Sequence, residues 1–110
     1  MAAIANLTID QGASFSSDVT VKDNNGDPFD LTGYTATAKM AKGYTSTRTR
    51  TTITTSIGSP TTGVVTLSLT PAQTNALDAE RYVYDLEIDT NGTVTRVIEG
   101  IITVRPSVSI

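Results

Sequence analysis

At 110 residues the chain is long enough for one domain with a single hydrophobic core, and we expect residues 1–110 to form one unit. Because it contains no cysteine and no histidine, disulfides, thiolate chemistry and a Ser-His-Asp hydrolase are excluded. The net charge of −3 disfavours nucleic acid as a partner, and no apolar run reaches the roughly 20 residues of a membrane span. The first residues lack the basic and apolar parts of a signal peptide, so we expect a soluble protein made in a cytoplasm.

Alternating apolar and polar residues run through most of the sequence and predict strands rather than helices. Threonine and serine supply 30 of the 110 residues, and threonine suits the solvent-facing side of a strand. Seven strands are expected, at residues 4–9, 13–22, 34–40, 45–57, 65–69, 82–89 and 93–104.

The fourth of these segments, residues 45–57, consists almost wholly of threonine, serine and arginine. Its only aliphatic residues are Ile53 and Ile57, so it has little to bury. We therefore expect a strand at a sheet edge or partly detached, with Arg48 and Arg50 helping to protect that edge against unwanted pairing.

One helical turn is predicted near residues 70–77. Thr70 is suited to the N-cap, Pro71 to the first helical position, and Gln73 to completing a capping box. A tyrosine follows, at position 82 or 84, as at the corner where immunoglobulin-like domains cross between their sheets. The sequence thus predicts an all-β fold, an immunoglobulin-like antiparallel β-sandwich of about seven strands.

Residues 82–104 are expected to form a hairpin, because Asn91-Gly92 supplies the positive φ that a tight turn needs. A two-residue loop would pair Ile88 with Thr95, whereas a three-residue loop would pair Ile88 with Val94, with Gly92 in the left-handed position of a bulged turn. The three-residue loop is favoured because it brings four apolar residues of the last strand to the buried face. These are Val94, Ile98, Ile102 and Val104.

Two acidic patterns are candidate sites of chemistry. Asp23, Asn25 and Asp27 resemble the start of a calcium loop, but the later ligand positions are not filled, and an Asx-rich turn is favoured. The three carboxylates within residues 85–89 share one strand face with no facing wall, so a solvated face is favoured over a catalytic pair. No catalytic, cofactor-binding or metal-binding residue is predicted.

The candidate contact surfaces are the two termini, residues 1–8 and 104–110, and the threonine-rich segment. The apolar candidates are Ile4, Leu7, Ile53, Val104, Val108 and Ile110. The basic candidates are Lys39, Lys42, Arg48 and Arg50. An acidic counterpart lies within residues 78–89, and copies would attract one another if the two regions lie on different sides of the domain. Two ordinary solvated surfaces are the equally weighted alternative.

Five stretches of the sequence carry a resemblance to a known family. They are Asp10–Phe15, Asp27–Tyr34, Gly63–Thr70, Arg81–Leu86 and Glu99–Val104. In their order and spacing they resemble the N-terminal domain of the phage baseplate upper protein family, an immunoglobulin-like structural domain of tailed-phage virions.

This resemblance implies a β-sandwich that docks on a virion, and it carries over no catalytic residue. The expected function is that of a non-enzymatic structural protein in the baseplate or tail-fibre region, or of a capsid decoration protein. It implies multiple symmetric copies in the virion, with other virion proteins as partners. The alternative is a carbohydrate-binding or adhesin module for a host glycan, which would need outward-facing aromatic residues such as Tyr44.

Overall fold

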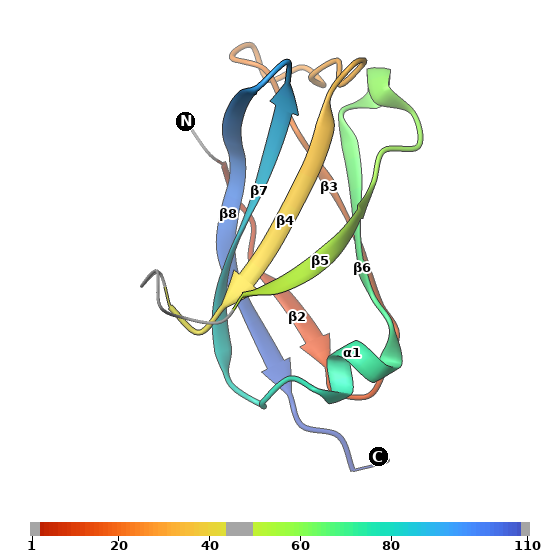
Figure 1. Ribbon diagram of the computed structural model, residues 1–110, viewed down its shortest axis with the longest axis vertical. Helices are drawn as coiled ribbons and strands as arrows, with labels where there is room; N and C mark the ends of the chain where they lie inside the picture. Colours follow the sequence, from red (N-terminus) through yellow and green to blue (C-terminus); the bar gives the residue numbers. More distant parts are fainter. Residues whose placement is uncertain (1–2, 44–49, 109–110) are drawn as a thin grey trace.

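The computed structural model describes residues 3–43 and 50–108, which form strands around one core (Figure 1). The strands are β1 (Ala3–Ile4), β2 (Leu7–Asp10), β3 (Phe15–Thr20), β4 (Thr35–Ala41), β5 (Thr51–Ser56), β6 (Val64–Leu69), β7 (Arg81–Thr90) and β8 (Thr93–Arg105). Two short helical elements, the 3-10 turn η1 (Pro60–Thr62) and the one-turn helix α1 (Pro71–Asn75), flank β6. The first expected strand is thus split in two, which gives eight strands among the described residues.

The strands form two layers, and the predicted immunoglobulin-like β-sandwich is confirmed. One layer has the order β1/β2-β8-β7-β4-β5, and the other has the order β5-β6-β3, so that β5 belongs to both. The expectation of a purely antiparallel sandwich is wrong at one point, because β1 and β2 pair with β8 in parallel. The chain therefore begins and ends on neighbouring strands that run in the same direction.

The core lies between the layers and follows the period-two pattern of the strands. In β7 every second residue, from Tyr82 to Ile88, is buried, and the carboxylates between them are only partly covered. Because successive side chains of a strand point to opposite faces, this one strand supplies four core residues. The opposite layer supplies Val19, Val65, Leu67 and Leu69.

The threonine-rich strand β5 is not at an edge, so that expectation is wrong. Its first half pairs with β4, where Ile53 lies opposite Ala38, and its second half pairs with β6, where Thr54 lies opposite Ser68. Ile53 is only 1% exposed. A strand with one buried isoleucine is held in place because it passes from one layer to the other, bonded to β4 over residues 51–53 and to β6 over residues 54–56.

The C-terminal hairpin combines features of both loops that the sequence allowed. Thr90 pairs with Thr93, so the loop is the two-residue one, and Asn91 and Gly92 both have positive φ, at 50° and 85°. The favoured three-residue loop is therefore wrong, and Val94 is 57% exposed rather than buried. A bulge then shifts the register beyond Glu87, which returns the remaining apolar residues of β8 to the core. These are Ile98, Ile102 and Val104.

The predicted helical turn and tyrosine corner are confirmed. The Thr70 hydroxyl accepts a hydrogen bond from the Gln73 main chain, and the Gln73 side chain accepts one from Thr70, which makes a capping box. The tyrosine of the corner is Tyr82. Its hydroxyl accepts a hydrogen bond from the N–H of Asp78 at 2.9 Å and donates to the carbonyl of the same residue at 3.3 Å.

Candidate docking groove

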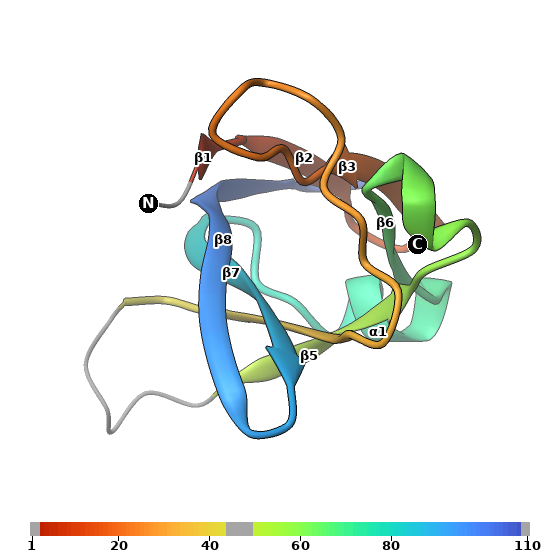
Figure 2. The ribbon, with the colours of Figure 1, turned by 90° about the horizontal axis from the view of Figure 1, so that it is seen from above.

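The two long sides of the sandwich are closed in different ways. On the closed side, β5 pairs with both layers. On the open side, β3 ends one layer and the N-terminal strand, meaning β1 and β2 together, ends the other. Seen from above, these two edges face each other (Figure 2). Within the described residues no main-chain pairing joins them.

A groove of about 460 Å³ lies between the two edges. Ile4 and Leu7 form one wall, Val97 and Ile98 of β8 form its base, and β3 with the residues after it forms the other wall. Ile4 is 76% exposed although it is a large aliphatic side chain. Volumes of roughly 300–1,000 Å³ with mainly apolar linings are typical of binding sites in proteins.

The wall formed by β3 presents unpaired main-chain groups. The N–H of Val21 donates to Gly63, so the odd-numbered residues of β3 direct their main-chain groups to β6. In an antiparallel ladder the alternate residues direct theirs the other way, which here means Ser16, Asp18 and Thr20 face the open side. All three are exposed. This edge therefore offers hydrogen bonds to a further strand.

The opposite wall is fixed to β8 by a close approach at Gly100. A Cβ built on Gly100 would lie 2.2 Å from the carbonyl oxygen of Ala5, so only glycine fits. Tyr84 lies opposite Gly100 on β7, and its hydroxyl donates to that same carbonyl of Ala5. Burial raises the pKa of Tyr84 to about 12. The N–H of Ile101 donates to the Asn6 side chain at 3.0 Å, which adds another anchor.

A second hollow of about 250 Å³ continues the groove toward the loops, since Lys22 and Val97 line both. Phe29 and Tyr34 line this part and pack edge to face, with their ring centroids 5.4 Å apart. The groove thus runs from an aliphatic part beside Ile4 to an aromatic part beside the loop ends.

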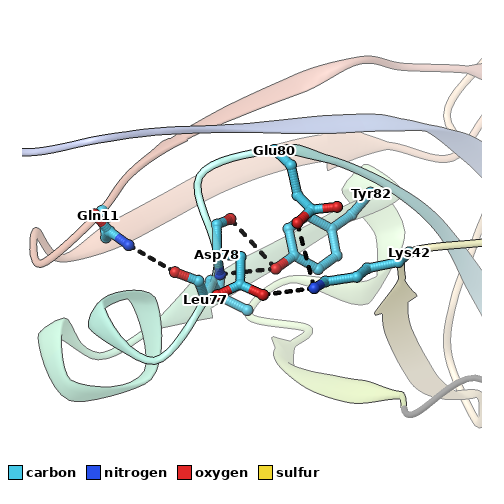
Figure 3. Close-up of polar contacts among 6 residues, drawn as sticks. All are labelled: Gln11, Lys42, Leu77, Asp78, Glu80 and Tyr82. Atoms are coloured by element: carbon cyan, nitrogen blue, oxygen red, sulfur yellow. Dashed lines mark hydrogen bonds and ion pairs between the residues drawn. The ribbon is translucent and has the colours of Figure 1, made fainter.

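The basic and acidic regions meet within one chain (Figure 3). The Lys42 ammonium contacts the carboxylates of Asp78 and Glu80. Its hydrogen bonds to these carboxylates raise the pKa of Lys42, and the bond to Asp78 has the larger effect. Lys39 lies opposite Asp85 in the ladder between β4 and β7. Lys39 and Lys42 therefore lie beside the acidic region, and for these two residues the premise that the two regions lie on different sides of the domain is wrong.

The contact residues predicted from the sequence are in part contradicted. Ile53 and Val104 are core residues, 1% and 2% exposed, because both face the space between the layers, and as contacts they were wrong. Ile4 and Leu7 line the groove, and Val108 is fully exposed. Lys39, Lys42 and Arg50 are at the surface. Arg48 and Ile110 lie outside the described residues.

The acidic candidates have structural roles where the chain is described. The Asp23 carboxylate accepts hydrogen bonds from the main-chain N–H groups of Asn25 and Asp27, as expected for an Asx-rich turn. Asp85 pairs with Arg96 at 3.3 Å. Over residues 3–43 and 50–108, no three His, Cys, Asp or Glu side chains gather as a metal site would require. No helix in these ranges is long and apolar enough to span a membrane.

The groove residues outside the N-terminal segment were not found as contacts from the sequence. They are Asp18, Val19, Thr20, Lys22, Val97 and Ile98. Asp18 and Lys22 carried no signal, because a sequence does not say which strands end the layers. Val97 lies at the bulge of β8, where it has no partner on β7. The sequence did not predict this bulge, so it did not predict the position of Val97.

Comparison with known proteins gives a fold and no family. No protein-family model matches the sequence, and no curated protein matches it. Among solved structures, the chain is similar to the N-terminal domain of phage TP901-1 ORF48, with 9% sequence identity and a TM-score of 0.57 over 92% of this chain and 85% of that one. The Lin-41 filamin domain gives 17% identity and a TM-score of 0.46, over 89% and 82% of the two chains. The chain thus shares its fold with a domain of a phage protein.

Proposed function

We propose that this chain is a non-enzymatic structural module of a tailed-phage particle that docks onto other particle proteins through the groove. The observation that carries the proposal is the open side, where an apolar groove lies beside an unpaired strand edge. A partner strand entering there would gain main-chain hydrogen bonds from β3 and apolar contact with Ile4 and Leu7. The fold shared with a phage protein domain supports a place in the particle.

The position in the particle, whether baseplate, tail fibre or capsid surface, is part of the test. Antibodies against the purified protein are applied to intact particles and located by immunogold electron microscopy. We expect labelling at one fixed structure of the particle. Absence of label on intact and on partly disassembled particles would contradict the proposal.

Binding of the purified protein to isolated capsids and tails then tests the groove. Ile4→Asp places a charge in the groove and should weaken this binding by about tenfold or more, since a buried aliphatic contact of this size is lost. Val94→Asp is the matched control, because Val94 is also an exposed aliphatic residue but does not line the groove. Equal loss in both variants would contradict docking through the groove.

A carbohydrate-binding function has less support. Tyr82 and Tyr84 are buried and bonded within the domain, so neither can stack on a sugar. Tyr34 is partly covered and packs against Phe29. Tyr44 lies outside the described residues, and loss of glycan-array binding in Tyr44→Ala is the result that would favour this function.

A further inference from the structure

The unpaired edge of β3 continues past the end of the strand to Lys22. The two hydrogen bonds of the bridge between Lys22 and Pro28 are made by the residues just before and just after Lys22, on the side that faces away from the groove. Successive residues of an extended chain direct their main-chain groups to opposite sides, so Lys22 directs its own groups to the open side. We call residues 16–22 the free edge.

Two opposite charges lie on the free edge, four residues apart. The side chains of Asp18 and Lys22 are exposed, lie on one face of the extended chain and both line the groove. About 13 Å of chain separates them, so they are too far apart to pair with each other. Among the residues that the structure describes, neither charge takes part in an ion pair. The Asp18 carboxylate accepts a hydrogen bond from the neutral Thr66 hydroxyl at 2.7 Å, which leaves its charge uncompensated.

The other face of the free edge borders the apolar part of the groove. Val19 and Val21 point between the two layers and are 6% and 3% exposed. A strand added beside them would place every second side chain on that same side, against Leu7 on one wall and Val97 and Ile98 at the base. The occupant therefore needs polar, charged residues on one face and apolar residues on the other.

We propose that the groove binds an extended segment of another particle protein, with a carboxylate and a cationic side chain four residues apart on one face and two apolar side chains between them on the other. The carboxylate lies opposite Lys22, the cation lies opposite Asp18, and the main chain bonds to the free edge. The apolar side chains lie against Leu7 and Ile98. This inference rests on the proposed docking function and names the chemistry of the partner.

The same two charges decide which strands the free edge refuses. A segment with two acidic or two basic residues at these places meets one like charge, and like charges directly opposite each other are destabilising. The β3 strand of a second copy could match the charges, but its apolar residues Val19 and Val21 are already buried in its own core. It cannot cover the apolar groove, so a separate protein is the favoured occupant.

Three synthetic peptides with blocked ends are the probes. The mixed peptide is Thr-Glu-Val-Thr-Val-Lys-Thr, and the two uniform peptides carry either glutamate or lysine at both charged positions. Binding to the isotope-labelled chain is followed by NMR titration. We expect the mixed peptide to bind about fivefold tighter than either uniform peptide, because one cross-strand pair changes from attraction to repulsion. The shifted signals should include residues 16–22 and Leu7.

Two variants of the free edge should change this order of binding. Asp18→Lys makes the edge doubly basic and should prefer the peptide with two glutamates, whereas Lys22→Asp should prefer the peptide with two lysines. Both positions are exposed, so circular dichroism should show an unchanged fold. Lys39→Asp is the matched control, because Lys39 is also exposed but does not line the groove, and it should keep the wild-type order. The same order in all four proteins, or no binding of any peptide, would overturn the proposal.

Binding to isolated capsids and tails separates this result from failure of the proposed function. If Ile4→Asp weakens that binding while the peptides are not distinguished, the groove docks a partner of different chemistry. If the edge variants change the order of the peptides while Ile4→Asp leaves binding to the particle parts unchanged, the preference holds and the docking function is wrong. Sedimentation velocity tests the second copy: self-association that Asp18→Lys abolishes would assign the free edge to another copy and overturn the proposal.

Discussion

The closed and open sides of this sandwich show that apolar content does not decide which strands become edges. The closed side depends on β5, which has only Ile53 buried among its threonines, yet its main chain bonds to both layers. The open side is lined by Ile4, Leu7 and Val97, yet within the described residues its two edges, β3 and the N-terminal strand, do not pair with each other. Main-chain hydrogen bonding closes one side, and the other is left with apolar surface and free main-chain groups.

A proline scan should break this comparison most strongly. Alternation in the ladder directs the N–H of Thr54 to β6, so Thr54→Pro removes a ladder hydrogen bond and leaves a β6 carbonyl unpaired, which should cost up to about 3 kcal/mol of unfolding free energy. Ser16→Pro is the matched change on the open side, where the N–H faces outward, and should cost much less. Urea unfolding of both variants checks this, and equal losses would show that β5 does not close the sandwich.

Alkaline pH should act on the anchor of the N-terminal strand. Burial raises the pKa of Tyr84 to about 12, above the ordinary value near 10, so the folded state favours the neutral phenol. The unfolded chain releases this proton first, so the stabilisation is complete below pH 10 and is lost as pH rises to about 12. The loss amounts to about 2.7 kcal/mol for a shift of this size.

The measurement is urea unfolding of the wild type and Tyr84→Phe between pH 8 and pH 12. The variant lacks the ionisable group, so its stability should fall less steeply over the same interval. If the two pH profiles run parallel above pH 10, the Tyr84 hydroxyl is not the buried group that the structure describes.

Gly100→Ala should produce a smaller but definite loss on the open side. The new Cβ would meet the Ala5 carbonyl, so the N-terminal strand must shift, and overpacking of this kind costs about 2 kcal/mol. Gly58→Ala is the control, because a Cβ at Gly58 meets nothing within 4 Å and its φ is not positive. Thermal or urea unfolding of both variants measures the difference, and a Gly100→Ala variant as stable as the control would contradict the close approach.

Features that depend on local chemistry were well predicted from the sequence. The buried row of β7 follows from period-two alternation, and the helix α1 follows from the order of Thr70, Pro71 and Gln73. The tyrosine corner was narrowed to two residues, and the structure selects Tyr82.

Features that depend on pairing between distant strands were not predicted. The position of β5 required knowing its neighbours, because threonine suits an edge strand and a central strand alike. The bulge in β8 was not predicted. Without a bulge, a two-residue loop would place Ile98 on the solvent face, so the three-residue loop was preferred. The groove was found only in part, at Ile4 and Leu7, since its other wall depends on which strand ends the second layer.

The parallel pairing of β2 with β8 has a mechanical consequence. The N-terminal strand begins near one end of the domain, which is 42 Å long, and β8 ends near the other end. A pull on β2 and β8 from these opposite ends would load the ladder between Leu7–Asp10 and Ile102–Arg105 all at once, in shear, and not one bond after another as in unzipping. Resistance to such a load would be set by the rate at which this short ladder ruptures.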